Sequence, residues 1–422
     1  MSLPAGSAGL SLDQAPPLSI PAGFFLLAPV AMAAVGVALT ADPAILLVSR
    51  ALPATIAVAH VGTLGFLLAV MLGALYQMIP VVAGVPVPAE RGAHVVQAAL
   101  ALAAVGLPLA FATGAGGAWW LAVQAALVVA LVFLGPAGWA LWRAPSRTPT
   151  VRGMTLAVLG LAGLVVVGVG LAAGRAAGVF VGDADAWTAV HVALALVVWV
   201  GGLLTAVSWQ ILPMFYLAAE VPRWTKGAVL LGVAWTLVAV PLAWLAGAGR
   251  DLVLGLAAPG ALVVWVLHPL FAVLSLRRRR RRRVDESMPF WYAGMAMAPL
   301  VLGAAALAAF GDGLEAALSF GWLAVSGWAG LVMHGMLTRI VAFLVWFHRF
   351  SPRVGLERVP AMRDLWPARR VRLGFAPHVA AVVLGALAPW TGSGPLARVA
   401  GVSLAIAAVV LGVSMVSALR RR

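Results

Sequence analysis

Cysteine is absent from this chain of 422 residues, and charged side chains are scarce. Without a thiol the protein can form no disulfide, no cysteine-bound iron–sulfur cluster, no thiolate nucleophile and no covalently attached c-type haem. Charged residues make up only 10% of the chain, against about a quarter in ordinary globular domains. Hydrophobic residues make up 63%. A water-soluble fold could not bury so much apolar surface, so the composition indicates a polytopic membrane protein and excludes soluble enzymes, disordered scaffolds and disulfide-rich secreted modules.

Long apolar stretches divide the chain into about twelve segments. A helix needs about 20 apolar residues to cross the hydrocarbon core of a bilayer. We therefore predict an all-α fold with transmembrane helices near residues 21–40, 52–79, 93–112, 118–141, 153–173, 187–212, 227–247, 252–275, 289–310, 316–346, 373–391 and 396–418. Residues 1–20 are predicted to be a cytoplasmic tail without a cleaved signal peptide, 21–418 a single membrane domain, and 419–422 a basic tail.

The basic residues, all but one of them Arg, set the predicted orientation. If the N-terminus is cytoplasmic, the inner segments hold 23 of them and the outer segments 4. This bias predicts a bacterial inner-membrane protein with both termini in the cytoplasm. The run Arg277–Arg283 lies between two spans, where it indicates an anchor on anionic lipid rather than a nucleic-acid site. None of the 13 carboxylates lies in a predicted span, which argues against an ion-driven carrier.

Three predicted helices share a polar pattern. The second helix holds His60 in its outer half and closes with an aromatic-Gln-x-x-Pro pattern at Gln77, and the sixth repeats both features with His191 and Gln210. In the tenth helix Arg339 takes the place of the glutamine. Four helices fit into each interval, so we predict three four-helix pseudo-repeats about a threefold axis along the membrane normal, at approximately 21–141, 153–275 and 289–418.

Histidines inside the predicted helices are candidate ligands, because a polar side chain in hydrocarbon is costly. His60 and His191 lie in the outer half, and His334 lies deep in the tenth helix. Neutral imidazole is a common ligand of haem iron and copper. We predict all three as metal- and cofactor-binding residues. The alternative is that each ring hydrogen-bonds to a backbone carbonyl and helps the helices to pack.

The other four histidines carry weaker predictions. His268 directly precedes Pro269, and we interpret it mainly as a partner for a carbonyl that the proline leaves unbonded. The sequence places the remaining three near the inner ends of helices, where histidine is ordinary: His94, His348 and His378.

Two further features bear on cofactor binding. Arg339 could pair with a haem propionate, since Arg binds carboxylates with two hydrogen bonds, or it could extend to the inner membrane surface. A helical wheel of the second helix gathers a His/Met stripe that would suit copper(I), although methionines at this spacing also serve packing. The stripe consists of His60, Leu67, Met71, Ala74 and Met78.

The second helix carries a family resemblance. The segment His60-Val-Gly-Thr-Leu-Gly65, with a polar residue 17 positions on at Gln77, resembles the H-x-x-T-x-G signature helix of the NnrS-type membrane proteins. The twelve-helix plan with histidines on helices 2 and 6 is also similar to the catalytic subunit of haem–copper oxidases and nitric oxide reductases. The resemblance implies b-type haem, copper and a link to nitric oxide. It places His60 at the position of a low-spin haem ligand and His191 at that of a copper ligand.

The chain departs from the oxidase pattern at three points. Residues 227–247 lack the histidine pair that completes the copper site, and the sixth helix lacks the catalytic tyrosine. The tenth helix has only His334, which is too deep to match the oxidase ligands. A complete oxygen- or nitric-oxide-reducing centre is therefore not expected.

Two functional hypotheses follow. The first is a membrane-bound haem b protein, with copper as a second candidate cofactor, that transfers electrons or handles nitric oxide or oxygen; as an enzyme it would be an oxidoreductase. The second is a transporter or assembly factor for copper, haem or another small solute. The longest predicted polar segment, 347–372, is short. A periplasmic electron donor or a partner cytochrome subunit would therefore dock on loops, and nucleic acid is not an expected partner.

Overall fold

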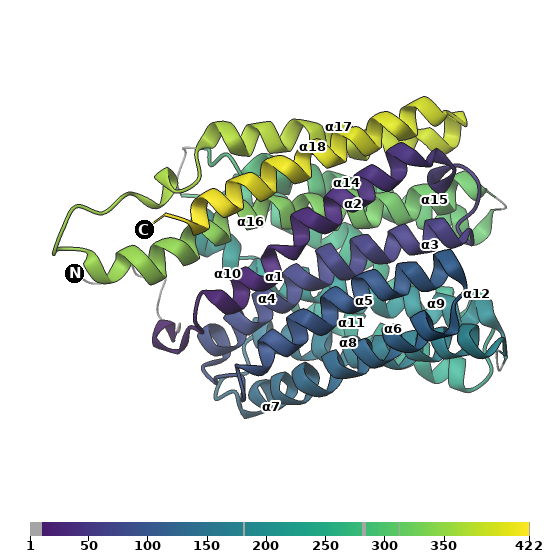
Figure 1. Ribbon diagram of the computed structural model, residues 1–422. Helices are drawn as coiled ribbons and strands as arrows, with labels where there is room; N and C mark the ends of the chain where they lie inside the picture. Colours follow the sequence, from purple (N-terminus) through teal and green to yellow (C-terminus); the bar gives the residue numbers. More distant parts are fainter. Residues whose placement is uncertain (1–10, 180–181, 281–283, 312, 422) are drawn as a thin grey trace. The chain divides into compact units, whose positions relative to one another are not determined.

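The computed structural model describes residues 11–179, 182–280, 284–311 and 313–421. Helices account for the regular structure of these residues (Figure 1). Within the described ranges, twelve helices are long and apolar enough to cross a membrane. The protein is therefore an all-α, polytopic integral membrane protein with twelve candidate spans, as the sequence predicts.

The spans follow the predicted apolar stretches closely. They cover Ser19–Ala41, Pro53–Ala83, Gly92–Thr113, Gly116–Arg143, Pro149–Ala177, Ala184–Tyr216, Arg223–Leu245, Arg250–Arg277, Met288–Phe310, Leu314–Arg353, Ala368–Thr391 and Gly394–Leu419. The tenth span differs most from its prediction. It continues from residue 346 to Arg353, because a π-helical turn at Trp346–Phe350 and a 3-10 turn at Ser351–Arg353 prolong it.

Proline and glycine set many of the span ends. Pro53 and Pro149 begin their helices, where the missing N–H would have no helical partner anyway. Gly114, Gly178 and Gly392 follow the last helical residues with φ of 66°, 67° and 61°. This left-handed conformation ends a helix, and glycine adopts it without the steric penalty that a Cβ imposes.

The helices group into two compact units, and the chain changes from one to the other after Pro16, within α4 (Ala69–Met78) and before Val284. The first unit comprises Met1–Pro16 and Leu75–Arg283. In it α8 packs against α6, α10 and α11. Its helices are α5 (Gly92–Thr113), α6 (Gly116–Val129), α7 (Gly135–Arg143), α8 (Pro149–Ala177), α9 (Ala184–Ala193), α10 (Gly202–Tyr216), α11 (Arg223–Leu245), α12 (Arg250–Leu262) and α13 (His268–Arg277).

The second unit comprises Pro17–Ala74 and Val284–Arg422. Its helices are α1 (Ser19–Phe25), α2 (Leu27–Ala41), α3 (Pro53–His60), α14 (Met288–Phe310), α15 (Leu314–Trp322), α16 (Gly330–Val345), α17 (Ala368–Thr391) and α18 (Gly394–Leu419). α18 packs against α2 and α17. α2 and α18 approach closely at Gly36 and Gly401, where a Cβ on either residue would lie 2.6 Å from the other's carbonyl oxygen. Small residues of this kind let membrane helices pack backbone against backbone.

Wide π-helical turns interrupt every even-numbered span up to the tenth. They occupy Val61–Leu68, Ala130–Leu134, Leu194–Gly201, Val263–Leu267 and Leu323–Ala329. Hydrogen bonds in a π-helix run from residue i to i+5, and such turns are frequent at functional sites. The second, sixth and tenth spans are also the most buried: 83%, 78% and 72% of their most apolar windows is buried, against 28–50% in the other nine. Greater burial therefore distinguishes these three spans, whereas the π-helical turn also occurs in the fourth and eighth.

Some predictions concern residues outside the described ranges. Residues 1–10 of the predicted N-terminal tail, Arg281–Arg283 of the basic run and Arg422 of the C-terminal tail all lie there. The grouping into three repeats about a threefold axis stays a prediction.

Candidate functional site

His60 stands where the second span changes from α-helix to π-helix. It is the last residue of α3, and the π-helical turn starts at Val61. Its Nδ1–H donates a hydrogen bond to the carbonyl oxygen of Ile56, one turn earlier, at 2.8 Å. A carbonyl only accepts, so Nδ1 carries the proton and the neutral ring has its lone pair on Nε2. The half-buried ring is thereby held on its own helix, with Nε2 on the opposite side of the ring from this hydrogen bond.

His191 stands three residues before the π-helical turn of the sixth span. It lies in α9 and is half-buried. Its ring packs against Gly168 of α8, where a Cβ would lie 3.2 Å from Cε1. His191 belongs to the first unit and His60 to the second. The ligand roles of both residues stay predictions.

His334 and His378 form a buried pair in the second unit. His334 lies in α16 and His378 in α17, and their Nδ1 atoms are 2.9 Å apart. The side chains are 1% and 0% exposed. The sequence places His378 near the inner end of its helix, and this placement is wrong. α17 begins at Ala368, so His378 lies about 15 Å along the helix, facing α16.

The partners of this pair determine which nitrogens carry protons. His378 Nε2–H donates to the carbonyl oxygen of Ser326 at 3.1 Å, so in a neutral ring its Nδ1 must accept. His334 Nδ1–H therefore donates to His378, and His334 keeps its lone pair on Nε2. Both rings are assigned as neutral, because a buried charge without a counter-charge is costly. The result is a directed chain of hydrogen bonds that ends on a backbone carbonyl in the π-helical turn of the tenth span.

The surroundings of His334 leave little space at Nε2. A Cβ on Gly374 of α17 would lie only 3.1 Å from this nitrogen. The ring of Phe290 lies 4.6 Å from the His334 ring, centroid to centroid. The geometry fits close packing of α16 and α17, and a metal at Nε2 would require these helices to separate. The metal and cofactor role of His334 stays a prediction.

His268 takes part in a similar chain in the first unit. The Ser208 hydroxyl donates to the carbonyl oxygen of Thr205 at 2.6 Å, so it accepts from His268 Nε2–H at 3.1 Å. His268 thus joins α13 to α10 rather than bonding to a carbonyl left by Pro269, which corrects that interpretation. Its Nδ1 is buried and has no hydrogen-bond partner among the described residues.

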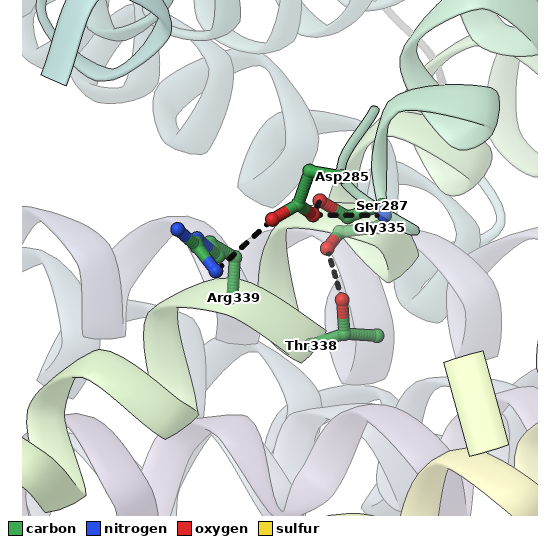
Figure 2. A network of polar contacts seen from close by, with 5 residues as sticks. All are labelled: Asp285, Ser287, Gly335, Thr338 and Arg339. Atoms are coloured by element: carbon green, nitrogen blue, oxygen red, sulfur yellow. Dashed lines mark hydrogen bonds and ion pairs between the residues drawn. The ribbon is translucent and has the colours of Figure 1, made fainter. Parts of the chain in front are cut away.

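Arg339 pairs with a carboxylate of the protein. Its guanidinium lies 3.1 Å from Asp285, which precedes α14, and the two side chains are 16% and 28% exposed (Figure 2). Asp285 also accepts hydrogen bonds from the backbone N–H and the hydroxyl of Ser287, at 3.0 and 2.6 Å. Thr338 directly precedes Arg339 in α16, and its hydroxyl donates to the carbonyl oxygen of Gly335. The structure therefore supplies Arg339 with an anionic partner, which the sequence did not indicate.

The predicted polar positions and the His/Met stripe have different surroundings. Gln77 is buried, and its Oε1 has no hydrogen-bond partner in the described part of the chain, whereas Gln210 is half-buried. In the second span, Leu67 and Met71 are buried, whereas His60 is only half-buried. The π-helical turn between His60 and Met71 shifts the helix phase, so the straight stripe expected from an α-helical wheel does not form. The argument for a copper(I) path along it is lost.

Histidine pairing is the main feature that sequence reasoning missed. Among the described residues no three His, Asp or Glu side chains gather into a metal-binding group. The pair that does form contains His334, a predicted site residue, and His378, which was not one. The available signal was the position of His378 inside an apolar span, the same signal that singled out the other intramembrane histidines.

Comparisons with known proteins add no assignment. No family model matches the chain, and no curated protein matches it. The resemblance to NnrS-type proteins and haem–copper oxidases therefore rests on the quoted residues alone.

Proposed function

We propose that this membrane protein binds a b-type haem through His60. The observation that carries the proposal is the hydrogen bond from His60 Nδ1–H to the carbonyl oxygen of Ile56. Metal-binding histidines almost always donate their second nitrogen in this way, because the bond fixes the tautomer and orients the ring. His60 already has this arrangement, and its side chain is half-buried rather than enclosed.

The neighbouring backbone supports the same assignment. The π-helical turn Val61–Leu68 begins at the next residue, and it carries Gly62 and Gly65 of the segment that resembles the NnrS-type signature. A π-helical turn weakens the regular hydrogen-bond pattern of a helix and is usually retained for function. His60 would hold the iron, and the bound haem would supply one-electron chemistry and affinity for diatomic gases. Electron transfer or the handling of nitric oxide or oxygen is the proposed role.

His191 is the second proposed ligand. It precedes a π-helical turn in the sixth span as His60 does in the second, and Gly168 leaves room for its ring. We propose that it binds a copper ion that is separate from the haem at His60. His191→Ala should then remove copper and leave the haem content unchanged.

Absorption spectroscopy of the purified protein tests the proposal. We expect a Soret band that shifts on reduction with dithionite. The pyridine-haemochrome assay should give about one haem per chain. His60→Ala should remove the band. His94→Ala is the matched control, because His94 is exposed and bonded to Gln97. The purified wild-type protein could be colourless and bind no haem even when haem is added. That result would contradict the proposal and favour the transporter or assembly-factor alternative.

A further inference from the structure

A basic hollow lies in the second unit, where two spans end. It has a volume of about 720 Å³ and is lined by Arg349, Arg353, Leu419 and Arg420. Binding sites for small molecules commonly enclose about 300–1,000 Å³, so a phospholipid headgroup or a free anion of similar size would fit. A second hollow of about 210 Å³ adjoins it through Arg353. This smaller hollow is lined by Phe350, Arg353, Arg358, Pro360, Asp364, Leu365 and Arg421.

The positive charge of the hollow is only partly balanced by the protein. Arg353 forms an ion pair with Glu357. Arg349 donates to the backbone carbonyl of Arg421, which carries no net charge. No carboxylate within the described residues forms an ion pair with Arg349, Arg358 or Arg420. Two guanidinium groups of the hollow, those of Arg349 and Arg420, thus have no carboxylate partner within the described residues.

The hollow lies where two of the candidate membrane spans end. Leu419 is the last residue of α18, and Arg349 lies in the π-helical turn that directly follows α16. α16 packs against α18, so both spans end beside each other (Figure 1). Trp346 donates its indole N–H to the carbonyl of Pro360 at 3.0 Å, which ties the following loop to the span. The charge bias of the sequence predicts that this end faces the cytoplasm.

We propose that this hollow binds the headgroup of an anionic phospholipid that carries two phosphates. Arg binds phosphate oxygens with paired, parallel hydrogen bonds, and several guanidiniums around one space suit more than one phosphate. Basic pockets between helices on the cytoplasmic side are known to take headgroups of this kind. The lipid of the inner leaflet, rather than a soluble polyphosphate, is the assigned source, because the side chain of Leu419 lines the same space at the end of a span. This site is independent of the proposed haem.

Lipid titration with native mass spectrometry tests the assignment. Protein in detergent would be titrated with cardiolipin, with the single-phosphate phosphatidylglycerol and with zwitterionic phosphatidylcholine, and inorganic pyrophosphate would serve as the soluble competitor. The test variant is R349Q/R420Q. The matched control is R277Q/R278Q, which removes two positive charges from a basic run in the first unit. The single variant Arg420→Gln is measured as well. It is expected to fold even if the double variant does not, because this residue follows the last helix.

The expected result is a preference for the diphosphate lipid that depends on the hollow. Direct Arg–phosphate pairs are strong charge-assisted hydrogen bonds that only residues lining the hollow can make, so R349Q/R420Q should weaken cardiolipin binding by about tenfold or more. The control should change it by less than about twofold, and haem content should stay the same in both. Equal weakening by both variants would overturn the site, since only diffuse charge would then matter. Binding of pyrophosphate as tight as that of cardiolipin would overturn the lipid assignment.

Discussion

His60 and the fully buried histidines use their hydrogen bonds differently. His60 bonds within its own helix, to Ile56 four residues earlier, and its ring is half-buried. His334 and His268 form hydrogen bonds with side chains on other helices, and their side chains are only 1% and 2% exposed. The first arrangement orients the ring on its own helix, whereas the second joins one helix to another.

This difference teaches that an intramembrane histidine is not by itself a ligand. A buried polar group must find a partner, and a second helix is the nearest source. The chain to Ser326 in the second unit and the chain to Thr205 in the first both end on backbone carbonyls. Histidines whose hydrogen bond goes to a carbonyl of their own helix are the better ligand candidates.

Haem content should separate the two classes most strongly. His60→Ala should lose nearly all bound haem, because it removes a coordinating nitrogen. His378→Phe should keep haem at the wild-type level, because His378 serves helix packing. The measurement is the pyridine-haemochrome ratio of haem to protein for the two purified variants. Haem loss in His378→Phe with His60→Ala unaffected would reverse the assignment of the two classes.

Unfolding of variants at the buried pair should give the next largest effect. His378→Leu leaves the Nδ1–H of His334 without an acceptor, which costs about 1–3 kcal/mol of unfolding free energy. The double variant His334→Leu/His378→Leu removes both polar rings and should cost less than the single one. Denaturant titration in detergent, monitored by tryptophan fluorescence, measures both. Additive losses would show that the two rings do not depend on each other.

Filling the space beside His334 should have a smaller effect. Gly374→Ala puts a methyl group 3.1 Å from Nε2 of a ring that is held by His378, so we expect a loss of about 1 kcal/mol. Gly303→Ala in the same unit meets nothing within 4 Å and should be neutral or stabilising. Thermal unfolding of the two variants, side by side, measures the difference. Equal melting temperatures would indicate that the ring yields freely.

The pair Arg339–Asp285 should matter least. Its two side chains are partly exposed, and such pairs contribute about 0–1 kcal/mol. Asp285→Asn should therefore lower the free energy of unfolding slightly, and the loss should shrink as salt is added. The measurement is the same denaturant titration at low and high ionic strength. A large loss that salt does not change would show that the network with Ser287, rather than the charge, stabilises this end of α14.

The fold was largely predictable because apolar runs of the right length are a direct signal for membrane spans. His60 and His191 were predictable as intramembrane histidines for the same reason. The contact between His334 and His378 was not, since it depends on how α16 and α17 face each other. Nor was the partner of Arg339, because Asp285 lies 54 positions earlier and outside the spans. The π-helical turns have no simple residue pattern, and a wheel drawn at α-helical spacing fails across them.

Those turns also make the affected spans tolerant to changes in length. Removing one residue from Val61–Leu68 would restore ordinary α-helical spacing, because a π-helical turn holds one more residue than an α-helical turn. The parts of the helix on either side, which carry His60 and Gln77, can then keep their positions and their buried faces. Homologous chains that differ by a one-residue gap are expected to place that gap inside these turns, so an alignment that puts it elsewhere would misassign every position between the gap and the true turn.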